Sequence, residues 1–251
     1  MSRLQTQVVR YVLLPGKPKS DFPQPELHDR VFHFWKQFWN GILARNGSPH
    51  QVNSEDFSRQ AYIGAFFAER RVIALHAHSF FDLSFASNRE HSYFSRYFTP
   101  KAWEGLRQRQ SRKVMTMEQF SVDPEWRFSQ QGVSLAAVMS GLAMKIATAH
   151  PIDTILAVAR ADVGIAQLGW SQGAVSLDSG VRLHNTPCEL LAFNPQTMQL
   201  PPGEEVRNLI SNFWKKRIDL CSEPKREPKL RSIRRSHEGG THAERNQREA
   251  A

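Results

Sequence analysis

Residues 113 to 159 constrain the fold most, because they predict a strand, a helix and a second strand in direct succession. Lys113 to Val122 is a β-rich run that Asp123-Pro124-Glu125 ends. From about Val133 to Ala149, apolar residues recur at three- and four-residue spacing, which is typical of a helix with one buried face. Ile152 to Ala159 is then almost continuously apolar, as in a strand buried on both faces. We therefore expect a sheet flanked by helices.

Further strands and helices are expected on both sides of this segment. They are a helix over about 28–45, a hairpin of 62–67 and 72–81, short helices over 99–108 and 162–168, a strand over 190–193 and a helix over 204–218. This order predicts a mixed α/β fold, not a regular doubly wound one. The proline-rich residues 1–27 are expected to form an extended lead-in, residues 28–221 the folded domain, and residues 82–98 an irregular connection within it.

The C-terminal segment, residues 222–251, differs from the rest in composition. It is rich in Lys and Arg, contains Pro and Gly, and has almost no apolar residues, within a chain of formal net charge +9. Such a segment cannot bury enough apolar surface to fold alone, so we expect it to be disordered. A basic tail can bind nucleic acid or an acidic protein, or it can be a solvated terminus without a partner.

Several classes of protein are excluded at this stage. Cys188 and Cys221 are the only cysteines, too few for a disulfide scaffold, so we expect a reducing, cytoplasmic compartment. No run approaches the roughly 20 apolar residues of a membrane helix. His76 and His78 are spaced like metal ligands, but no third ligand accompanies them, so we expect no metal. Motifs for nucleotide hydrolysis, dinucleotide redox and zinc-protease chemistry do not occur.

Glu118 is the residue most suggestive of chemistry. Strand alternation over the run from Lys113 places it on one face with Val114, Thr116 and Phe120, in otherwise apolar surroundings. A carboxylate is costly there unless it is paired or protonated. It is therefore either a general base beside a cleft or a structural partner of a buried arginine.

The segment Gln130-Gln131-Gly132-Val133-Ser134 leads into the central helix. Free backbone N–H groups at a helix N-terminus can hold an anion, and a glycine lets a phosphate approach the main chain. A single glycine is also compatible with an ordinary helix entry.

Taken in order, these elements resemble one known family. A strand ending Glu118-x-x-x-Val-Asp-Pro-x-x-Arg, a helix, the strand Ile155-Leu-Ala-Val and a Leu168-Gly169-Trp170 ending are similar to the GNAT superfamily of N-acyltransferases. Within it, Met117 to Asp123 is most similar to a segment of the acyl-homoserine-lactone synthases and N-acyl amino acid synthases, and Tyr97-Phe98-Thr99-Pro100 also resembles the N-acyl amino acid synthases. The resemblance covers about residues 28–195. It implies a mixed sheet in which the strand from Lys113 and the strand from Ile152 splay apart.

The resemblance also implies a mechanism and a set of site residues. An acyl thioester on coenzyme A or acyl carrier protein would lie between the splayed strands, and no cofactor would be bound permanently. Backbone N–H groups of Phe120, Ser121 and Val122 would hold the thioester oxygen. Glu118 would take a proton from the attacking amine. The main-chain donors of residues 131–134 (Gln131, Gly132, Val133 and Ser134) would hold the pantetheine phosphate.

Two departures from the family pattern affect the choice of donor and the proton transfers. The glycine-rich loop matches only at Gly132, which disfavours a full coenzyme A pyrophosphate and mildly favours a carrier protein. The tyrosine often found before Leu-Gly-Phe, a general acid for the thiolate, is replaced by Ile165-Ala166-Gln167. Either the thiolate leaves unaided or the protein is a non-catalytic relative.

Aromatic and basic residues complete the predicted site. The acyl-pocket candidates are Trp35, Phe38, Trp39, Phe66 and Phe80, which can equally be plain core. Arg107, Arg109, Arg112 and Lys113 form a basic cluster that an acidic carrier protein could dock on, or a solvated turn.

The sequence therefore predicts an N-acyltransferase that moves a fatty acyl group to the amino group of a small acceptor such as an amino acid. The alternative is an inactive GNAT-like module that binds nucleic acid or an acidic protein through its basic tail.

Overall fold

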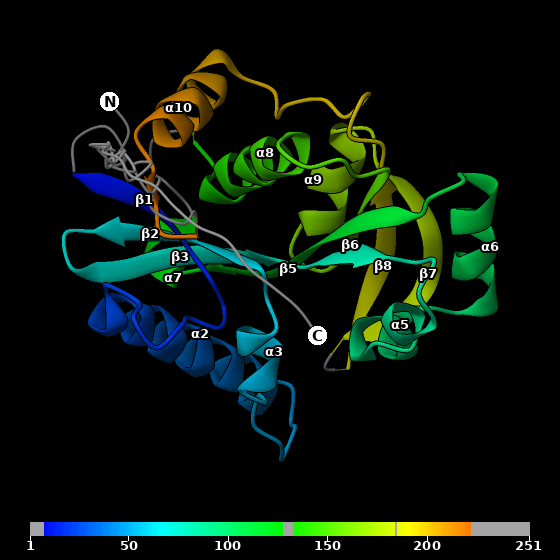
Figure 1. The fold of residues 1–251 in the computed structure, drawn as a ribbon, viewed down its shortest axis with the longest axis horizontal. Helices are drawn as coiled ribbons and strands as arrows, with labels where there is room; N and C mark the ends of the chain where they lie inside the picture. The colour runs from blue at the N-terminus through cyan, green and yellow to red at the C-terminus, as the bar shows by residue number, and fades with distance from the viewer. Residues whose placement is uncertain (1–7, 128–132, 184, 222–251) are drawn as a thin grey trace, which may run out of the picture. The chain divides into compact units, whose positions relative to one another are not determined.

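A computed structural model describes residues 8–127, 133–183 and 185–221, and residues 1–221 contain one compact unit. Its centre is a mixed sheet with the strand order β7-β8-β6-β5-β3-β2-β1-β9, in which β4 also pairs with β5 (Figure 1). The strands are β1 (Val9–Leu14), β2 (Tyr62–Ala68), β3 (Arg71–His78), β4 (Phe80–Asp82), β5 (Lys113–Val122), β6 (Thr154–Arg160), β7 (Val175–Leu183), β8 (Thr186–Phe193) and β9 (Ile218–Asp219). The central pair, β5 and β6, is parallel, and each is antiparallel to its other main neighbour, β3 and β8.

Helices lie on both faces of this sheet. They are α2 (Pro25–Arg45), α3 (Glu55–Ser58), α4 (Ala86–Arg89), α5 (Ser92–Tyr97), α6 (Pro100–Gln108), α7 (Pro124–Arg127), α8 (Leu135–Thr148), α9 (Ile165–Ser171) and α10 (Glu204–Lys215). Local sequence explains several helix starts. Thr99 caps α6 by accepting a hydrogen bond from the Ala102 N–H, with Pro100 at the first helical position. Ser134 caps α8 in the same way.

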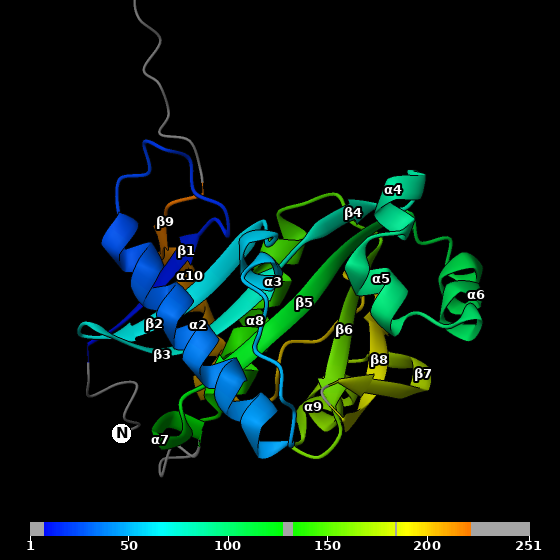
Figure 2. The same cartoon turned by 90° about the horizontal axis from the view of Figure 1, so that it is seen from below.

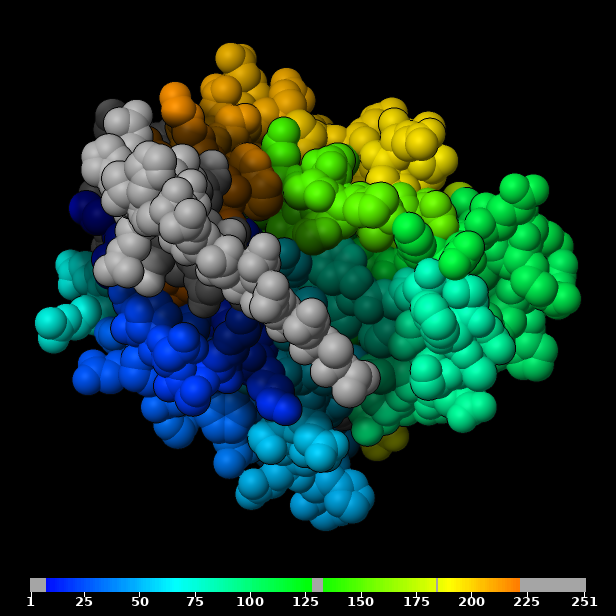
Figure 3. Space-filling view, in the orientation of Figure 1, coloured from blue at the N-terminus to red at the C-terminus, as the bar shows by residue number. Residues whose placement is uncertain are grey.

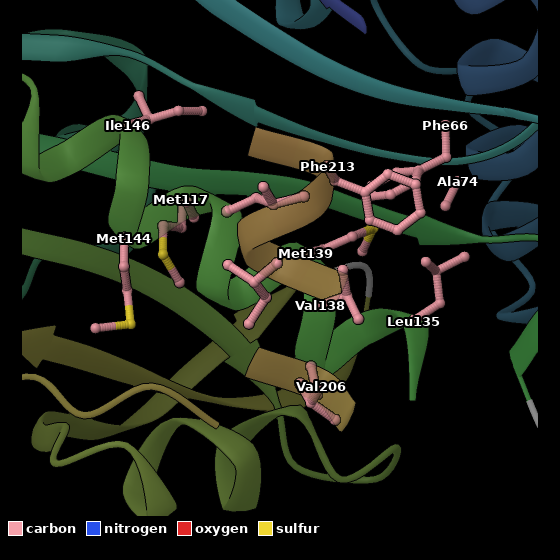
Figure 4. Close-up of a cluster of buried hydrophobic side chains, with 14 of the residues drawn as sticks. Phe66, Ala74, Met117, Leu135, Val138, Met139, Met144, Ile146, Val206 and Phe213 are labelled. Carbon is pink, nitrogen blue, oxygen red and sulfur yellow. The ribbon is translucent and has the colours of Figure 1, made fainter. Parts of the chain in front are cut away.

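The helices divide the core into three clusters. On one face, α8, α9 and α10 cover the sheet, and Phe66 packs edge-on against Phe213 at 5.2 Å between ring centroids (Figure 4). On the other face, α2 covers β1 to β3 through Val31, Trp35 and Trp39. The short helices α5 and α6 cover the β6–β8–β7 half of that second face (Figure 2). The second face is thus covered by two separate groups of helices.

The mixed α/β fold is confirmed, but several expected elements are corrected. The predicted lead-in contains β1, which lies in the sheet between β2 and β9 and is buried from Tyr11 to Leu14. The strand was not predicted, because the prolines that follow it indicated an extended terminus for the whole segment. The connection over residues 82–98 contains α4 and α5, and the expected strand over 72–81 is interrupted at Ser79. Strand β7, which is largely exposed, was missed because it lacks a strong apolar alternation.

Among the described residues, no helix combines the length and apolar character that crossing a bilayer requires. The expected disorder of residues 222–251 lies outside the described part of the chain.

Candidate functional site

The central strands of the sheet separate halfway along their length. Strands β5 and β6 are paired from Val114–Thr154 to Met117–Ala157. Beyond this point β5 continues to Val122 along β3, and β6 continues to Arg160 along β8. Figure 2 shows the two strands close at one end and divergent at the other. The expected splay is therefore present, and it opens toward the C-terminal ends of both strands.

A cavity of about 910 Å³ occupies this gap. Its lining comes from both faces of the sheet, with α2 and α5 on one side and α8 and α9 on the other. In Figure 3 the surface is hollowed between the blue α2–α3 segment, the teal α5 segment and the green helices. The cavity thus reaches both faces, which is possible because the two strands are apart there.

A β-bulge shapes one wall of the cavity. The register between β3 and β5 shifts from Ala77–Glu118 to Leu75–Ser121, so that two residues of β5 face one of β3. Gln119, in the bulge, has φ +59°, a left-handed conformation that is uncommon outside glycine. Its side-chain oxygen accepts a hydrogen bond from Trp35 Nε1 at 2.9 Å. The regular alternation expected through Phe120 is therefore wrong beyond Glu118.

The bulge also decides which backbone amide faces the gap. The Asp123 N–H donates to the Ile73 carbonyl of β3 at 2.9 Å. Because N–H directions alternate along an antiparallel strand, the Val122 N–H points to the opposite edge, which is the edge of the gap. Val122 and Phe120 line the cavity, whereas Ser121 is fully buried and donates its hydroxyl to the Gln119 carbonyl at 2.8 Å. Of the three predicted carbonyl-holding residues, two reach the cavity.

Glu118 lies at the start of the bulge, with 8% of its surface exposed, and lines the cavity. One carboxylate oxygen lies 2.5 Å from Arg59 Nη2, and the other accepts a hydrogen bond from Thr116 Oγ1 at 2.7 Å. The pairing with arginine is the structural role that the sequence left open. The position on the cavity wall is the one a general base needs. Both observations hold for the same side chain.

Charges of both signs surround Glu118 on this side of the sheet. Asp56 lies 3.5 Å from Arg59 Nε and 3.3 Å from Arg96 Nη1, so two arginines share two carboxylates. Tyr97 lines the same region, and burial, together with the nearby Glu118 charge, raises its pKa to about 12. Its hydroxyl is therefore protonated at neutral pH. This half of the cavity is polar and close to balanced in charge.

Three arginines lie at the open end of the gap; the sequence pointed to Arg127 only as the end of the family motif and did not point to the other two. Arg127 ends α7, Arg160 ends β6, and Arg45 ends α2; all three line the cavity. Burial, followed by the positive charges of Arg45 and Arg160, lowers the pKa of Arg127. Asp162 neutralises one of these charges by accepting two hydrogen bonds from Arg160 in a bidentate ion pair. The excess of positive charge makes this end suited to an anion.

The structure describes two of the four predicted phosphate-holding residues, Val133 and Ser134. Gln131 and Gly132 lie outside the described residues. Val133 is buried in the core under α8, and Ser134, the cap of α8, lines the cavity. The three arginines at the open end of the gap come instead from elements far apart in the chain, and only the fold brings them close to Ser134.

The acyl-pocket candidates separate into two groups. Trp35, Phe38 and Trp39 line the cavity from α2. Phe66 lies in the core against Phe213, and Phe80 packs against Tyr62 and His150 at 5.7 and 4.4 Å, so neither reaches the cavity (Figure 4). On the opposite face the walls are mostly apolar and were not anticipated. They include Met117, Val122, Met139, Ala157, Ile165, Leu168, Leu191 and Phe193.

The two strand histidines form part of a buried hydrogen-bond chain. His78 Nδ1 donates to the Thr116 carbonyl at 3.0 Å, so its Nε2 accepts from His76 Nδ1 at 2.7 Å. His76 Nε2 in turn accepts from the Tyr11 hydroxyl at 2.9 Å. His76 also packs on Phe120 of the bulge, with ring centroids 5.8 Å apart. Within the described residues, no group of three side chains is arranged to hold a metal ion.

The basic cluster at the start of β5 is partly neutralised. Arg107 pairs with Glu104, and Arg112 pairs with Asp82 at 3.1 Å. This leaves less free positive charge on that surface than the sequence indicated.

Comparison with solved structures places the fold. No family model matches the sequence, and neither does any curated protein sequence. FeeM, an N-acyl amino acid synthase from uncultured soil microbes, superposes with a TM-score of 0.52 at 11% identity, over 78% of this chain and 97% of that one. BjaI, a CoA-dependent acyl-homoserine lactone synthase solved with SAM and isopentyl-CoA, gives 0.51 at 10% identity, over 87% and 95%. The predicted GNAT-like fold is confirmed.

Proposed function

We propose that the chain is an N-acyltransferase that moves an acyl group from a thioester to the amino group of a small acceptor. The observation that carries this proposal is the cavity in the gap between β5 and β6, with Glu118 on its wall and the Val122 N–H directed toward the gap. The likeness in fold to acyl-transferring enzymes supports it.

The thioester carbonyl is expected to lie in the gap beside the bulge. The Val122 N–H, aided by that of Phe120, donates to the carbonyl oxygen and stabilises its negative charge as the amine attacks. A carbon–nitrogen bond forms, the carbon–sulfur bond breaks, and the thiolate leaves. Glu118 accepts the proton that the amine loses, directly or through a water. Arg59 and Thr116 hold the carboxylate in place for this transfer.

The donor is expected to carry a phosphate, as coenzyme A and acyl carrier protein both do through their pantetheine arm. Arg45, Arg127 and Arg160 lie at the open end of the gap, where the arm would enter. The N-terminus of α8, marked by Ser134, lies on the same cavity and adds backbone donors. These groups suit the single phosphate of a carrier-protein arm; coenzyme A would present a pyrophosphate at the same place.

The acyl chain and the acceptor are assigned to opposite halves of the cavity. The apolar wall from α8, α9 and β8 suits a fatty chain, because burying its methylene groups removes apolar surface from water. The polar half around Glu118 suits the amine, since its ion pairs can bind a charged or hydrogen-bonding group.

The test is production of N-acylated lipid in a bacterial host. Cells expressing the unsubstituted chain, Glu118→Gln, or the exposed control Glu90→Gln are extracted and analysed by mass spectrometry. We expect new N-acylated amines from the unsubstituted chain and Glu90→Gln, and at least a hundredfold less from Glu118→Gln.

Loss of product has to be separated from loss of fold, because Glu118→Gln leaves the half-buried Arg59 with only one of its two partner carboxylates, Asp56. The double variant Arg59→Met/Glu118→Gln removes both charges and serves as the folding control, with thermal unfolding measured for each protein. A folded Glu118→Gln protein that still makes the lipid would refute the assignment of the base.

A further inference from the structure

The Tyr93 hydroxyl is a buried polar group without a partner in the described part of the chain. Only 1% of Tyr93 is exposed, and its oxygen makes no hydrogen bond to any described residue. Buried hydroxyls in folded proteins are almost always paired, and each exception calls for an explanation. An unpaired hydroxyl in the wall of a cavity is explained if a ligand supplies the partner.

Tyr93 lies in the polar half of the cavity described above. It lines the cavity with Glu118, Arg59 and Tyr97. Its ring is held by edge-on contacts with Phe94 and Tyr97, both 5.4 Å between centroids. The ring therefore has a fixed place on α5, and the position of its hydroxyl is fixed with it.

Two neighbouring side chains, Arg59 and Thr116, are already engaged. Arg59 pairs with Glu118 and Asp56, and Thr116 donates to Glu118. Burial, and secondarily the Glu118 charge, raises the pKa of Tyr93 well above its ordinary value, so the hydroxyl keeps its proton. The free group on this wall is thus a hydrogen-bond donor that needs an oxygen or nitrogen acceptor.

We propose that the Tyr93 hydroxyl donates a hydrogen bond to an oxygen of the acceptor substrate. This inference rests on the proposed function and refines it: the acceptor is an amine that also carries an oxygen, such as an amino acid or amino alcohol. A plain alkylamine of the same size would fill the site but leave the hydroxyl desolvated and unpaired. Sites built around a buried polar group reject ligands that cannot pair with it.

The experiment compares Tyr93→Phe, which removes only the hydroxyl, with Tyr62→Phe, a half-buried tyrosine outside the cavity. Product per amount of folded protein is measured by mass spectrometry of host lipids, and the thermal midpoint of each purified protein is recorded. We expect Tyr93→Phe to lower product at least tenfold with an unchanged or higher midpoint, because an unpaired buried hydroxyl does not stabilise the fold. We expect Tyr62→Phe to leave product unchanged. Fragmentation of the product should show oxygen on the amine portion.

Each alternative result overturns a defined part of the reasoning. Undiminished product from Tyr93→Phe, or a product with a plain alkylamine head group, overturns the assignment of the hydroxyl. A thermal midpoint several degrees lower for Tyr93→Phe overturns it too, since the hydroxyl would then have a structural partner. If the unsubstituted chain makes no N-acylated lipid, the proposed function itself fails, and this assignment falls with it.

Discussion

The buried chain of Tyr11, His76 and His78 predicts that the protein loses stability in mild acid. Each ring nitrogen of the two histidines is already engaged, so an added proton forces at least one hydrogen bond of the buried chain to be reversed or lost. Burial lowers the pKa of His78 from 6.5 to about 4, and burial followed by the His78 charge lowers that of His76 well below its ordinary value. Both histidines are therefore neutral in the folded protein at pH 7.

The sign follows from counting protons in the two states. The unfolded chain protonates His78 near pH 6.5, whereas the folded protein resists protonation until about pH 4. Between these values the unfolded state binds more protons, so the free energy of unfolding falls as the pH is lowered. For His78 alone the loss is about 2 kcal/mol by pH 5 and about 3 kcal/mol by pH 4. His76 adds to it in the same direction.

Burial also lowers the pKa of His91 from 6.5, so His91 adds to the loss in the same window, whereas the aspartates titrate below it. The pKa values of Asp162 and Asp178 are lowered by hydrogen bonds, from Arg160 and from Thr99 respectively. Their contribution is thus lost mainly below 3.8, their ordinary value. A fall in the free energy of unfolding between pH 6.5 and 4 therefore reports chiefly on buried histidine.

The assay is urea unfolding at several pH values from 7 to 4. We compare the unsubstituted chain with His76→Gln/His78→Gln and with the exposed control His33→Gln. The double variant is expected to be less stable at pH 7 and to lose most of the pH dependence across the window, with His91 supplying what remains, while His33→Gln keeps the slope. A flat profile for the unsubstituted protein, or an unchanged slope in the double variant, would refute the reasoning.

Two further predictions concern packing and donor binding. Gly64→Ala should destabilise the protein by about 3 kcal/mol, because its Cβ would overlap the His76 ring and the Tyr11 hydroxyl. Gly41→Ala in helix α2 should instead stabilise it by about 1 kcal/mol in the same urea assay, because the nearest atom to its Cβ, in the Arg45 side chain, lies 3.6 Å away. Arg127→Ala should weaken binding of coenzyme A about tenfold and reduce its salt dependence in calorimetric titrations. Equal affinity before and after that substitution would remove the arginine from the phosphate site.

The sequence could predict the parts of the fold and site that depend on local pattern. The apolar runs of β5, α8 and β6 stand out because each element is buried over most of its length. Glu118 could be identified because a charged residue in such a run is conspicuous. The cap of α8 at Ser134 is likewise a local signal. Each of these features is decided within about ten residues of chain.

The rest depends on contacts between distant segments. Arg45, Arg127 and Arg160 share one cavity mouth, although no spacing in the sequence relates them. Tyr93 looks like an ordinary core aromatic, and only the structure shows that its hydroxyl is buried without a described partner. Phe66 and Phe80 do not reach the cavity because of the face of the strand on which each lies. Side-chain direction at this level follows from register and bulges, which composition does not reveal.

Keeping the gap between β5 and β6 open costs free energy, which points to a function at that place. Two neighbouring parallel strands normally continue their ladder, because each lost backbone hydrogen bond leaves polar groups to be satisfied elsewhere. Here pairing stops after Met117 and Ala157, although both strands continue for several residues. Beside the gap the chain also holds Gln119 in a left-handed conformation and leaves the Tyr93 hydroxyl unpaired among the described residues. Three local penalties around one cavity are what a ligand site requires and what a purely structural sheet would avoid.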